Sequence, residues 1–267
     1  MAKIPRISHI QEFKDTGKKF ACLTSYDELT AATFDEAGIA LILVGDSGAE
    51  NHLGHESVLA MTLDEIIHLG RAVAKSVEKA LVVVDMPFGS YEASVEDAVR
   101  NAIRIMKETG AEAVKLEGGV RSKAQISAIV EAGIPVVGHI GFTPQSVHAL
   151  GGYKVQGRGE AAEQLMADAQ AVQEAGAFAV VLELVPAELA NSVTKQLSIP
   201  TIGIGAGNGT DGQILVWTDF AGLSSQKPRK FVKQYAQLGA ILEQAAKDYI
   251  SDVQNSVFPA PEHEFEG

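Results

Sequence analysis

The stretch Leu81-Val82-Val83-Val84-Asp85 passes directly from an apolar run into a carboxylate. Short runs rich in β-branched residues are typical of parallel strands buried on both faces. Four other runs end on an ionisable residue in the same way: residues 40–44 before Asp46, 113–114 before Lys115 and Glu117, 136–137 before His139, and 179–182 before Glu183. The C-terminal strand ends of a β/α barrel form one rim that carries its chemistry. The pattern therefore predicts an α/β protein of the (β/α)8 TIM barrel class with an ionisable rim.

Repeated helix endings support this prediction. A glutamate followed two residues later by glycine recurs before apolar runs, at residues 36–38, 108–110, 131–133 and 174–176. Glycine at this place closes a helix in the left-handed conformation, so each helix is expected to lead at once into a strand. Thr62 and Glu65 have the spacing of a capping box at a helix start. Counting the strands gives eight, the barrel number: residues 20–24, 41–44, 81–84, 113–116, 136–138, 179–182, 201–204 and 214–217.

The chain length of 267 residues suits one barrel of about 250 residues with short extensions. We expect a single domain over residues 1–267, and a doubly wound sheet of this size is the alternative. Residues 1–19 are expected to form a helix that closes the bottom of the barrel. Apolar residues at helical spacing from Phe231 to Tyr249 predict a long last helix. The acidic, proline-interrupted residues 259–267 predict a mobile tail.

The charge balance limits the classes of partner. A formal net charge of −12 argues against nucleic acid or an acidic membrane surface, because binding to either needs a basic patch. The N-terminal residues are too polar for a signal peptide, and no apolar stretch is long enough to span a bilayer. Cys22 is the single cysteine. We therefore expect a cytoplasmic protein without disulfides that acts on small molecules.

Asp46, Asp85 and Glu117 follow three neighbouring strands of the predicted barrel. Their carboxylates would converge at the rim and repel one another unless a cation lies between them. Carboxylate oxygens and water are the ligands that Mg²⁺ prefers, so the pattern predicts a divalent-metal site. The alternative is that each carboxylate caps a helix or pairs with a lysine. His139 is interpreted as a substrate contact, and a metal ligand or a structural residue are the alternatives.

Two further rim residues have a predicted role. Lys115 and Glu117 are two positions apart on one strand, so both side chains are expected to face the lumen. A buried ammonium needs an anion, which predicts a carboxylate neighbour or an anionic ligand for Lys115; an ion pair with Glu117 alone is the simpler alternative. Glu183 lies between apolar residues. Desolvation is expected to raise its pKa toward the range of a general base at neutral pH.

Seven segments spread along the chain carry a family resemblance. They are LTSYD at 23–27, VGDS at 44–47, DMPF at 85–88, VKLEGG at 114–119, GHIGFTPQ at 138–145, GGYKVQGRG at 151–159 and IGIGAG at 202–207. In combination they closely resemble the ketopantoate hydroxymethyltransferase family, also called 3-methyl-2-oxobutanoate hydroxymethyltransferase. The match loosens at residues 48–52 and 60–61.

The resemblance implies a barrel of the phosphoenolpyruvate-binding superfamily and a transferase of pantothenate biosynthesis. Such an enzyme moves a hydroxymethyl group from 5,10-methylenetetrahydrofolate to 3-methyl-2-oxobutanoate, giving 2-dehydropantoate through a metal-stabilised enolate. It implies one divalent ion per subunit, usually Mg²⁺, and a homodecamer built as a ring of dimers. By matching motif, the metal ligands fall on Asp46, Asp85 and Glu117, the substrate contacts on Asp46, Ser47, Asp85, Lys115 and His139, and the catalytic base on Glu183.

Two other classes of function fit parts of the pattern. Another Mg²⁺-dependent carbon–carbon lyase or mutase of the same superfamily, acting on a small 2-oxo acid, would use a similar carboxylate cluster. Such enzymes typically carry a catalytic cysteine in a flexible loop, whereas Cys22 lies at the start of a predicted strand. A barrel that only senses a ligand would have no use for an isolated base such as Glu183. A nucleotide site at Gly203–Gly209 is disfavoured because the third glycine of the dinucleotide fingerprint is missing.

Overall fold

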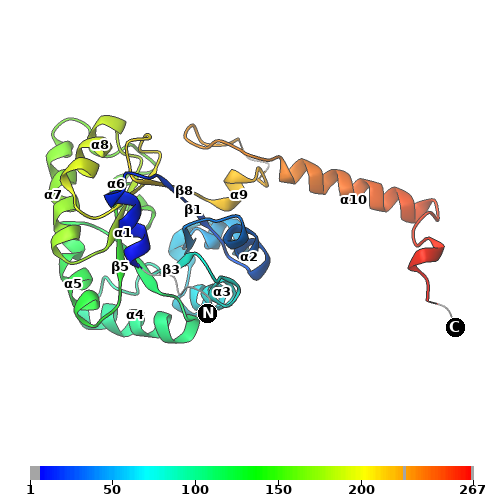
Figure 1. The fold of residues 1–267 in the computed structure, drawn as a ribbon, viewed down its shortest axis with the longest axis horizontal. Coiled ribbons are helices and arrows are strands. Elements are labelled where there is room, and N and C mark those ends of the chain that lie inside the picture. The colour runs from blue at the N-terminus through cyan, green and yellow to red at the C-terminus, as the bar shows by residue number, and fades with distance from the viewer. Residues whose placement is uncertain (1–6, 225–226, 266–267) are drawn as a thin grey trace. The chain divides into compact units, whose positions relative to one another are not determined.

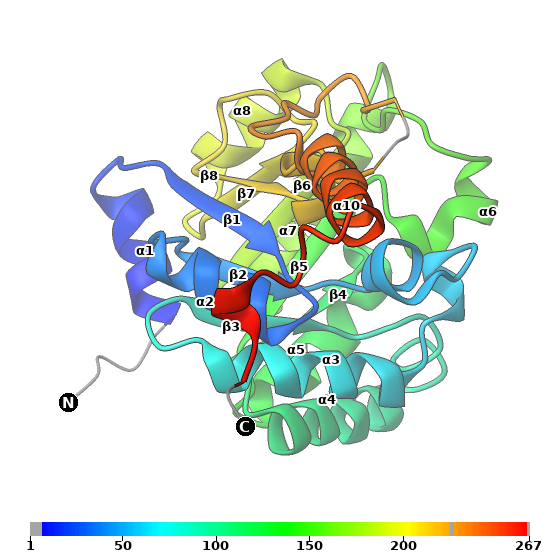
Figure 2. The same cartoon turned by 90° about the vertical axis from the view of Figure 1, so that its right-hand side faces the viewer.

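Eight parallel strands close into a barrel in which each strand pairs with the next and β8 pairs with β1 (Figures 1 and 2). The prediction of eight strands is confirmed. The strands are β1 Phe20–Thr24, β2 Leu41–Val44, β3 Leu81–Asp85, β4 Ala113–Glu117, β5 Val136–Gly141, β6 Ala179–Glu183, β7 Thr201–Ile204 and β8 Gly212–Leu215. The predicted eighth strand is displaced: β8 begins at Gly212, and Trp217 begins a helix.

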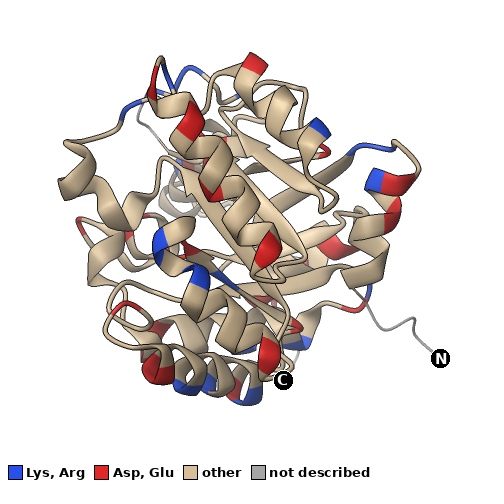
Figure 3. Cartoon of the chain, turned by 90° about the vertical axis from the view of Figure 1, so that its left-hand side faces the viewer, with Lys and Arg blue, Asp and Glu red and all other residues tan. Residues whose placement is uncertain are grey.

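Helices surround the barrel in the order in which they occur in the chain. The larger ones are α2 Glu28–Glu36, α3 Leu63–Ser76, α4 Val95–Thr109, α5 Lys123–Glu131, α7 Ala161–Glu174 and α8 Ala187–Gln196, with the short α6 Val147–Leu150 before α7. Neighbours in this series contact one another around the outside, α2 with α3, α3 with α4, α4 with α5, α5 with α7 and α7 with α8. Acidic and basic residues are interspersed on the outer helices in Figure 3, as in the ion pairs of Arg104 on α4 with Asp64 and Glu108. The predicted capping box of α3 is present between Thr62 and Glu65.

The computed structural model describes residues 7–224 and 227–265, and the chain divides into two compact units at Val216. The barrel lies in the first unit. The second contains α9 Trp217–Phe220, α10 Leu238–Gln254 and a short 3-10 helix at Pro261–His263. The prediction of one domain over the whole chain stays a prediction. No helix in the described ranges has the length and apolar character needed to cross a membrane.

The last helix starts later than its apolar spacing predicts. The spacing begins at Phe231, whereas α10 begins at Leu238. The reason lies in the backbone: the amide of Tyr235 donates to the carbonyl of Phe220, and the amide of Leu238 donates to that of Ala221. These amides are bonded to the α9 segment and not to a preceding helical turn. Within the predicted tail, residues 266–267 lie outside the described residues.

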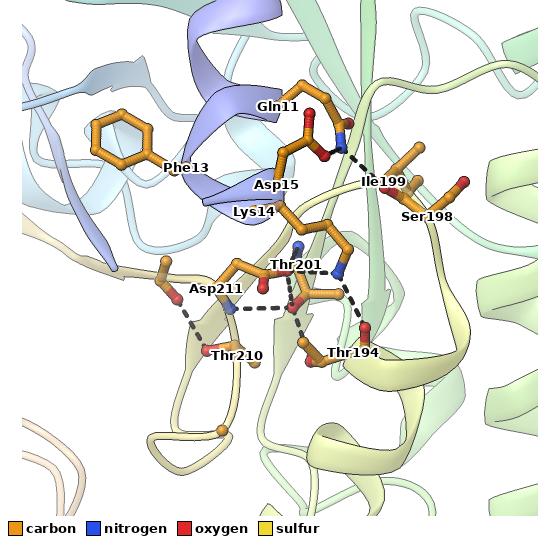
Figure 4. A network of polar contacts seen from close by, with 12 residues as sticks. Gln11, Phe13, Lys14, Asp15, Thr194, Ser198, Ile199, Thr201, Thr210 and Asp211 are labelled. Atoms are coloured by element: carbon orange, nitrogen blue, oxygen red, sulfur yellow. Dashed lines mark hydrogen bonds and ion pairs between the residues drawn. The ribbon is translucent and has the colours of Figure 1, made fainter. Parts of the chain in front are cut away.

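Helix α1, Ile7–Asp15, confirms the predicted N-terminal helix, while residues 1–6 of that prediction lie outside the described part of the chain. Ile10 of α1 is buried in the core cluster of the barrel, and the ring of Phe13 lies 5.1 Å from that of Phe20 of β1. The Lys14 ammonium bonds to Asp211, the residue just before β8, at 3.0 Å (Figure 4). These contacts are made at the N-terminal ends of the strands, so α1 closes that end of the barrel.

Candidate active site

Strand periodicity places the ionisable residues in the barrel lumen. Leu81 and Val83 of β3 belong to the core cluster, and the next position on the same face is Asp85. The same alternation leads from Ala113 to Lys115 and Glu117 on β4. It also leads from Val137 to His139 on β5 and from Val181 to Glu183 on β6. In the register of the sheet, Asp85 is beside Lys115 and Glu117 is beside His139. The rim predicted from the sequence is therefore one continuous group of side chains.

The side chains of this group form a chain of ionic contacts. Lys115 Nζ lies 2.6 Å from Asp85 Oδ1, so the predicted carboxylate neighbour of Lys115 is Asp85 and not Glu117 alone. His139 lies between two glutamates, with Nδ1 at 3.4 Å from Glu117 Oε1 and Nε2 at 3.3 Å from Glu183 Oε2. Lys115 Nζ is also 3.4 Å from His139 Nδ1. Five of the predicted residues thus share one buried network.

Asp46 and Ser47 join the site from the end of β2. The Asp46 amide donates to Asp85 Oδ2 at 3.0 Å, which links β2 to β3. Gly45 provides the room, since a Cβ there would lie 2.8 Å from Ser47 Oγ and 3.4 Å from Asp85 Oδ2. The Ser47 hydroxyl shares a hydrogen bond of 2.9 Å with Tyr26. All the predicted site residues therefore lie at the same rim.

Burial gives the carboxylates unusual protonation behaviour. Asp46 is 4% exposed and Asp85 is 1% exposed. Desolvation, reinforced by the charges of Asp85 and Glu117, raises the pKa of Asp46 to about 8. Desolvation also raises the pKa of Asp85, although the Lys115 ammonium opposes this rise. Burial thus disfavours the charged form of both carboxylates, and the Lys115 ammonium offsets this effect only in part.

The two basic groups keep their protons. Desolvation lowers the pKa of Lys115, but the nearby negative charges of Asp85, Asp46 and Glu117 raise it by more. The pKa of Lys115 therefore lies above its usual value. For His139, burial and the Lys115 charge favour the neutral ring. The facing carboxylates of Glu117 and Glu183, at 3.4 and 3.3 Å, outweigh both effects and raise the pKa of His139 to about 9. An ammonium and an imidazolium thus face the carboxylates at neutral pH.

The carboxylate oxygens partly fit a divalent cation. The buried oxygens Asp85 Oδ1 and Glu117 Oε1 meet Lys115 Nζ at 2.6 Å and His139 Nδ1 at 3.4 Å as ion pairs. Carboxylate oxygens are hard ligands of the kind that Mg²⁺ prefers. Across residues 7–224 and 227–265, however, no three Asp, Glu, His or Cys side chains are grouped closely enough to hold a metal as they stand. Lys115 and His139 occupy the positions beside these oxygens, so binding of an ion would require small side-chain shifts.

Two buried residues of the site were not predicted from the sequence. Gln145 donates from Nε2 to Asp46 Oδ2 at 2.8 Å, and its backbone amide donates to Glu117 Oε2 at 3.1 Å. The Tyr91 hydroxyl donates to Gln145 Oε1 at 2.5 Å. Gln145 ends one of the segments that carry the family resemblance, which was an available signal. Tyr91 lies in the loop after β3 with no motif around it.

The backbone beside Glu183 is constrained. Gly141 at the end of β5 has φ +90°, and a Cβ there would lie 2.3 Å from the Glu183 carbonyl oxygen. Only glycine allows the strands to approach this closely. Leu184, the residue after Glu183, has φ 49°, in the left-handed region that a branched side chain rarely adopts. Such constraint is common where a side chain must be aimed at a ligand.

A cavity of about 490 Å³ adjoins the C-terminal ends of β4 and β5. Its walls include Gly118 and Gly119, which follow Glu117, and Gly141, which lies against Glu183. Leu165 and Asp168 of α7 line another side. Its volume is in the range of pockets for small-molecule ligands. The rim therefore has room next to it for a second ligand.

Comparison with known proteins identifies the family. Residues 5–261 match the family described as ketopantoate hydroxymethyltransferase. The chain belongs to this family. It is 59% identical over 260 residues to the 3-methyl-2-oxobutanoate hydroxymethyltransferase of Leifsonia xyli subsp. xyli. The matched region covers 97% of this chain and 94% of that relative. The corresponding protein of Corynebacterium glutamicum is 57% identical over 264 residues, with 99% and 98% covered. The chain is therefore an enzyme of the hydroxymethyltransferase class.

Solved structures agree on the fold. A phosphonopyruvate hydrolase in complex with oxalate and Mg²⁺ superimposes with a TM-score of 0.62 at 12% identity, covering 97% of this chain and 91% of the other. A 2,3-dimethylmalate lyase of the PEP mutase/isocitrate lyase superfamily gives a TM-score of 0.59 at 15% identity, covering 99% and 93%. At such identities the likeness concerns the fold alone. The predicted (β/α)8 barrel fold is confirmed.

Proposed function

We propose that this enzyme transfers a hydroxymethyl group from 5,10-methylenetetrahydrofolate to 3-methyl-2-oxobutanoate, giving 2-dehydropantoate in pantothenate biosynthesis. One observation carries the proposal: in a member of the ketopantoate hydroxymethyltransferase family, the candidate base Glu183 lies within one buried rim together with Lys115 and a group of carboxylates. The rim combines groups that can bind an acid, stabilise an enolate and remove a proton.

The 2-oxo acid would bind through its charged end. Lys115 keeps its ammonium charge in the lumen, so it would attract the substrate carboxylate, and the Ser47 hydroxyl at the same rim could donate a hydrogen bond. Asp46, Asp85 and Glu117 would hold a divalent ion, with Mg²⁺ as the first candidate. Bound there, the ion would draw electron density from the ketone oxygen and so stabilise an enolate.

Glu183 would remove the proton from C3 of the substrate. It is 8% exposed, and its carboxylate faces His139 Nε2 at 3.3 Å. A ring nitrogen in that place would orient the Glu183 carboxylate through this contact. His139 would also approach the substrate, since its ring lies between Glu117 and Glu183. C3 would then form a bond to the one-carbon unit as the bonds from that carbon to the folate nitrogens break; one water molecule would supply the hydroxyl oxygen, and tetrahydrofolate would leave.

The folate must reach C3 from above the rim. The cavity of about 490 Å³ beside β4 and β5 offers space for a second ligand close to Glu117 and Glu183. Exclusion of water would matter, since a reactive methylene donor hydrolyses in water. The burial of the ionic network supports such exclusion.

Assembly and location belong to the same proposal. We propose a cytoplasmic homodecamer built as a ring of dimers. No residue of α10 is buried within the chain, and large apolar side chains such as Ile241, Leu242 and Tyr249 are more than half exposed. Exposed apolar groups on one helix favour contact with another subunit. Sedimentation analysis should give a species of ten chains, and a monomer would contradict this assembly.

Deuterium exchange tests the chemistry without folate. Wild-type protein with Mg²⁺ and 3-methyl-2-oxobutanoate in D₂O should exchange the C3 proton, seen by NMR as loss of the C3 signal and simplification of the methyl doublet. Removal of the metal by a chelator should stop the exchange. Adding 5,10-methylenetetrahydrofolate should convert the substrate to 2-dehydropantoate. Cleavage of the 2-oxo acid in the absence of folate would instead favour the alternative, a Mg²⁺-dependent lyase or mutase.

A further inference from the structure

Gln145 touches three parts of the rim at once. It is 6% exposed. Its Nε2 donates to Asp46 Oδ2 at 2.8 Å and to the Met86 carbonyl at 3.0 Å, while its backbone amide donates to Glu117 Oε2 at 3.1 Å. One residue therefore holds an oxygen of each of two carboxylates that come from different strands.

The orientation of the Gln145 amide is fixed by Tyr91. The backbone amide of Glu117 donates to the Tyr91 hydroxyl at 3.2 Å, so that hydroxyl is an acceptor for Glu117. The same hydroxyl donates its own hydrogen bond to Gln145 Oε1 at 2.5 Å. With Oε1 held there, the NH₂ group must face Asp46 and the Met86 carbonyl.

A reversed amide would be strongly disfavoured. Its oxygen would meet the Met86 carbonyl, and its NH₂ group would meet the Tyr91 proton. These two contacts would then join two acceptors and two donors in a buried place, where unsatisfied polar groups are costly. The Tyr91–Gln145 pair is thus a rigid element with a single arrangement.

We propose that Gln145, locked by Tyr91, is a positioning residue that sets Asp46 and Glu117 to receive a divalent cation. Gln145 holds one oxygen of each carboxylate, Asp46 Oδ2 and Glu117 Oε2, and so fixes the direction in which each carboxylate points. The other oxygen of each carboxylate makes no contact with Gln145. The second oxygen of Glu117, Oε1, is buried and meets His139 Nδ1 at 3.4 Å. This inference rests on the metal-dependent function proposed above.

Three variants test the role. Gln145→Met keeps the length of the side chain and the backbone amide but removes the contacts of the side-chain amide. Tyr91→Phe removes only the hydroxyl that fixes it. Gln173→Met is the matched control, because Gln173 Oε1 accepts hydrogen bonds from the amide and hydroxyl of Ser198, before β7 and away from the rim. Thermal unfolding of each variant reports the structural cost of the change.

The measurement is direct binding of Mn²⁺ to the whole protein, followed by electron paramagnetic resonance without substrate turnover. Residues that orient metal ligands typically change metal affinity by about 10- to 100-fold, which is the loss expected for Gln145→Met. Tyr91→Phe, which removes one hydrogen bond, should lose about three- to tenfold. Gln173→Met should bind as the wild type does, even if it unfolds at a lower temperature.

The outcomes separate this inference from the proposed function. Wild-type affinity in both folded rim variants would overturn the positioning role while the proposed function stands. If Gln145→Met does not fold, unchanged affinity in Tyr91→Phe overturns the role by itself. Equal losses in Gln173→Met and Gln145→Met would also overturn it, since the effect would then follow general stability. Wild-type protein that takes up no Mn²⁺ would overturn the metal-dependent function, and this role with it.

Discussion

The two ends of the barrel bury charge in different ways. At the N-terminal end, Lys14 Nζ bonds to Asp211 Oδ2 at 3.0 Å and to the Thr194 carbonyl at 2.9 Å, and the same Asp211 oxygen accepts from the Thr201 amide at 2.9 Å (Figure 4). At the C-terminal rim, four carboxylates share two cationic groups. They are Asp46, Asp85, Glu117 and Glu183, with Lys115 and His139.

The contrast separates a structural site from a functional one. The contacts at the base give each charged group a partner without any ligand, so this network can serve stability alone. At the rim the charges do not balance, and the pKa of Asp46 is raised to about 8. Groups whose pKa values are shifted by burial and by like charges gather at functional sites. Substitutions at the C-terminal rim should therefore lower activity, and substitutions at the N-terminal end of the barrel should lower the stability of the fold.

The largest effect is expected at Glu183. Glu183→Gln removes the proposed base, so the rate of C3 proton exchange should fall by about 10²- to 10⁴-fold, the usual contribution of a positioned base. NMR in D₂O with Mg²⁺ and 3-methyl-2-oxobutanoate measures this rate. Glu163→Gln, an exposed change on α7, is the control and should leave the rate unchanged. Exchange at the wild-type rate in Glu183→Gln would exclude this residue as the base.

Asp85→Ala should lower the metal-dependent binding of 3-methyl-2-oxobutanoate by at least about 100-fold. This figure is the upper end of the effect of residues that only orient ligands, and a direct ligand should matter more. The fold should survive, because Lys115 keeps the charges of Asp46 and Glu117 nearby. Calorimetry with Mg²⁺ measures the affinity, and circular dichroism checks the fold. Unchanged affinity would refute the ligand role of Asp85.

At the N-terminal end of the barrel, a substitution should lower the free energy of unfolding and leave the activity unchanged. Lys14→Met removes an ammonium whose side chain is 15% exposed and bonded to Asp211. Losing charge-assisted hydrogen bonds of this kind costs about 1–2 kcal/mol, or about 3–6 °C in Tm. Arg100→Met is the control, because the ion pairs of Arg100 are exposed and should contribute little. A loss of kcat/KM in folded Lys14→Met would break the distinction between the two ends.

The same contrast explains which features could be predicted from the sequence. The strand period of two places Asp85, Lys115, Glu117 and Glu183 on the lumen face once the apolar runs are recognised. Their order along the chain then brings them to neighbouring strands. The fold and the composition of the rim follow from local patterns of this kind.

The partners within the rim could not be predicted in this way. Lys115 pairs with Asp85 on the adjacent strand, which depends on the sheet register and not on spacing along the chain. Tyr91 and Gln145 meet across 54 positions, from two different loops. The start of α10 was misplaced because Tyr235 and Leu238 bond to the α9 segment, a long-range contact that the helical spacing of apolar residues does not encode.

The smallest effect is expected at Glu65, a carboxylate whose hydrogen bonds are all made within the protein. It tests whether such a group contributes to stability, as the Lys14–Asp211 pair at the N-terminal end of the barrel is expected to do. Glu65 accepts from the Thr62 amide at 2.8 Å and from its hydroxyl at 2.7 Å. These bonds, helped by His55, lower the pKa of Glu65 from 4.5 to about 2. A lowered pKa adds stability that is present above about pH 4.5 and is lost as the pH falls toward 2.

Glu65→Gln should therefore be less stable than the wild type at neutral pH, and the difference should shrink through that window. Because the Glu65 side chain is 35% exposed, solvent screening should keep the difference below about 1 kcal/mol. Urea unfolding at several pH values measures it. Glu163→Gln, an exposed change on α7 that lies outside any capping box, is the control and should show no such convergence. A difference that grows as the pH falls would mean that Glu65 does not stabilise α3 through its charge.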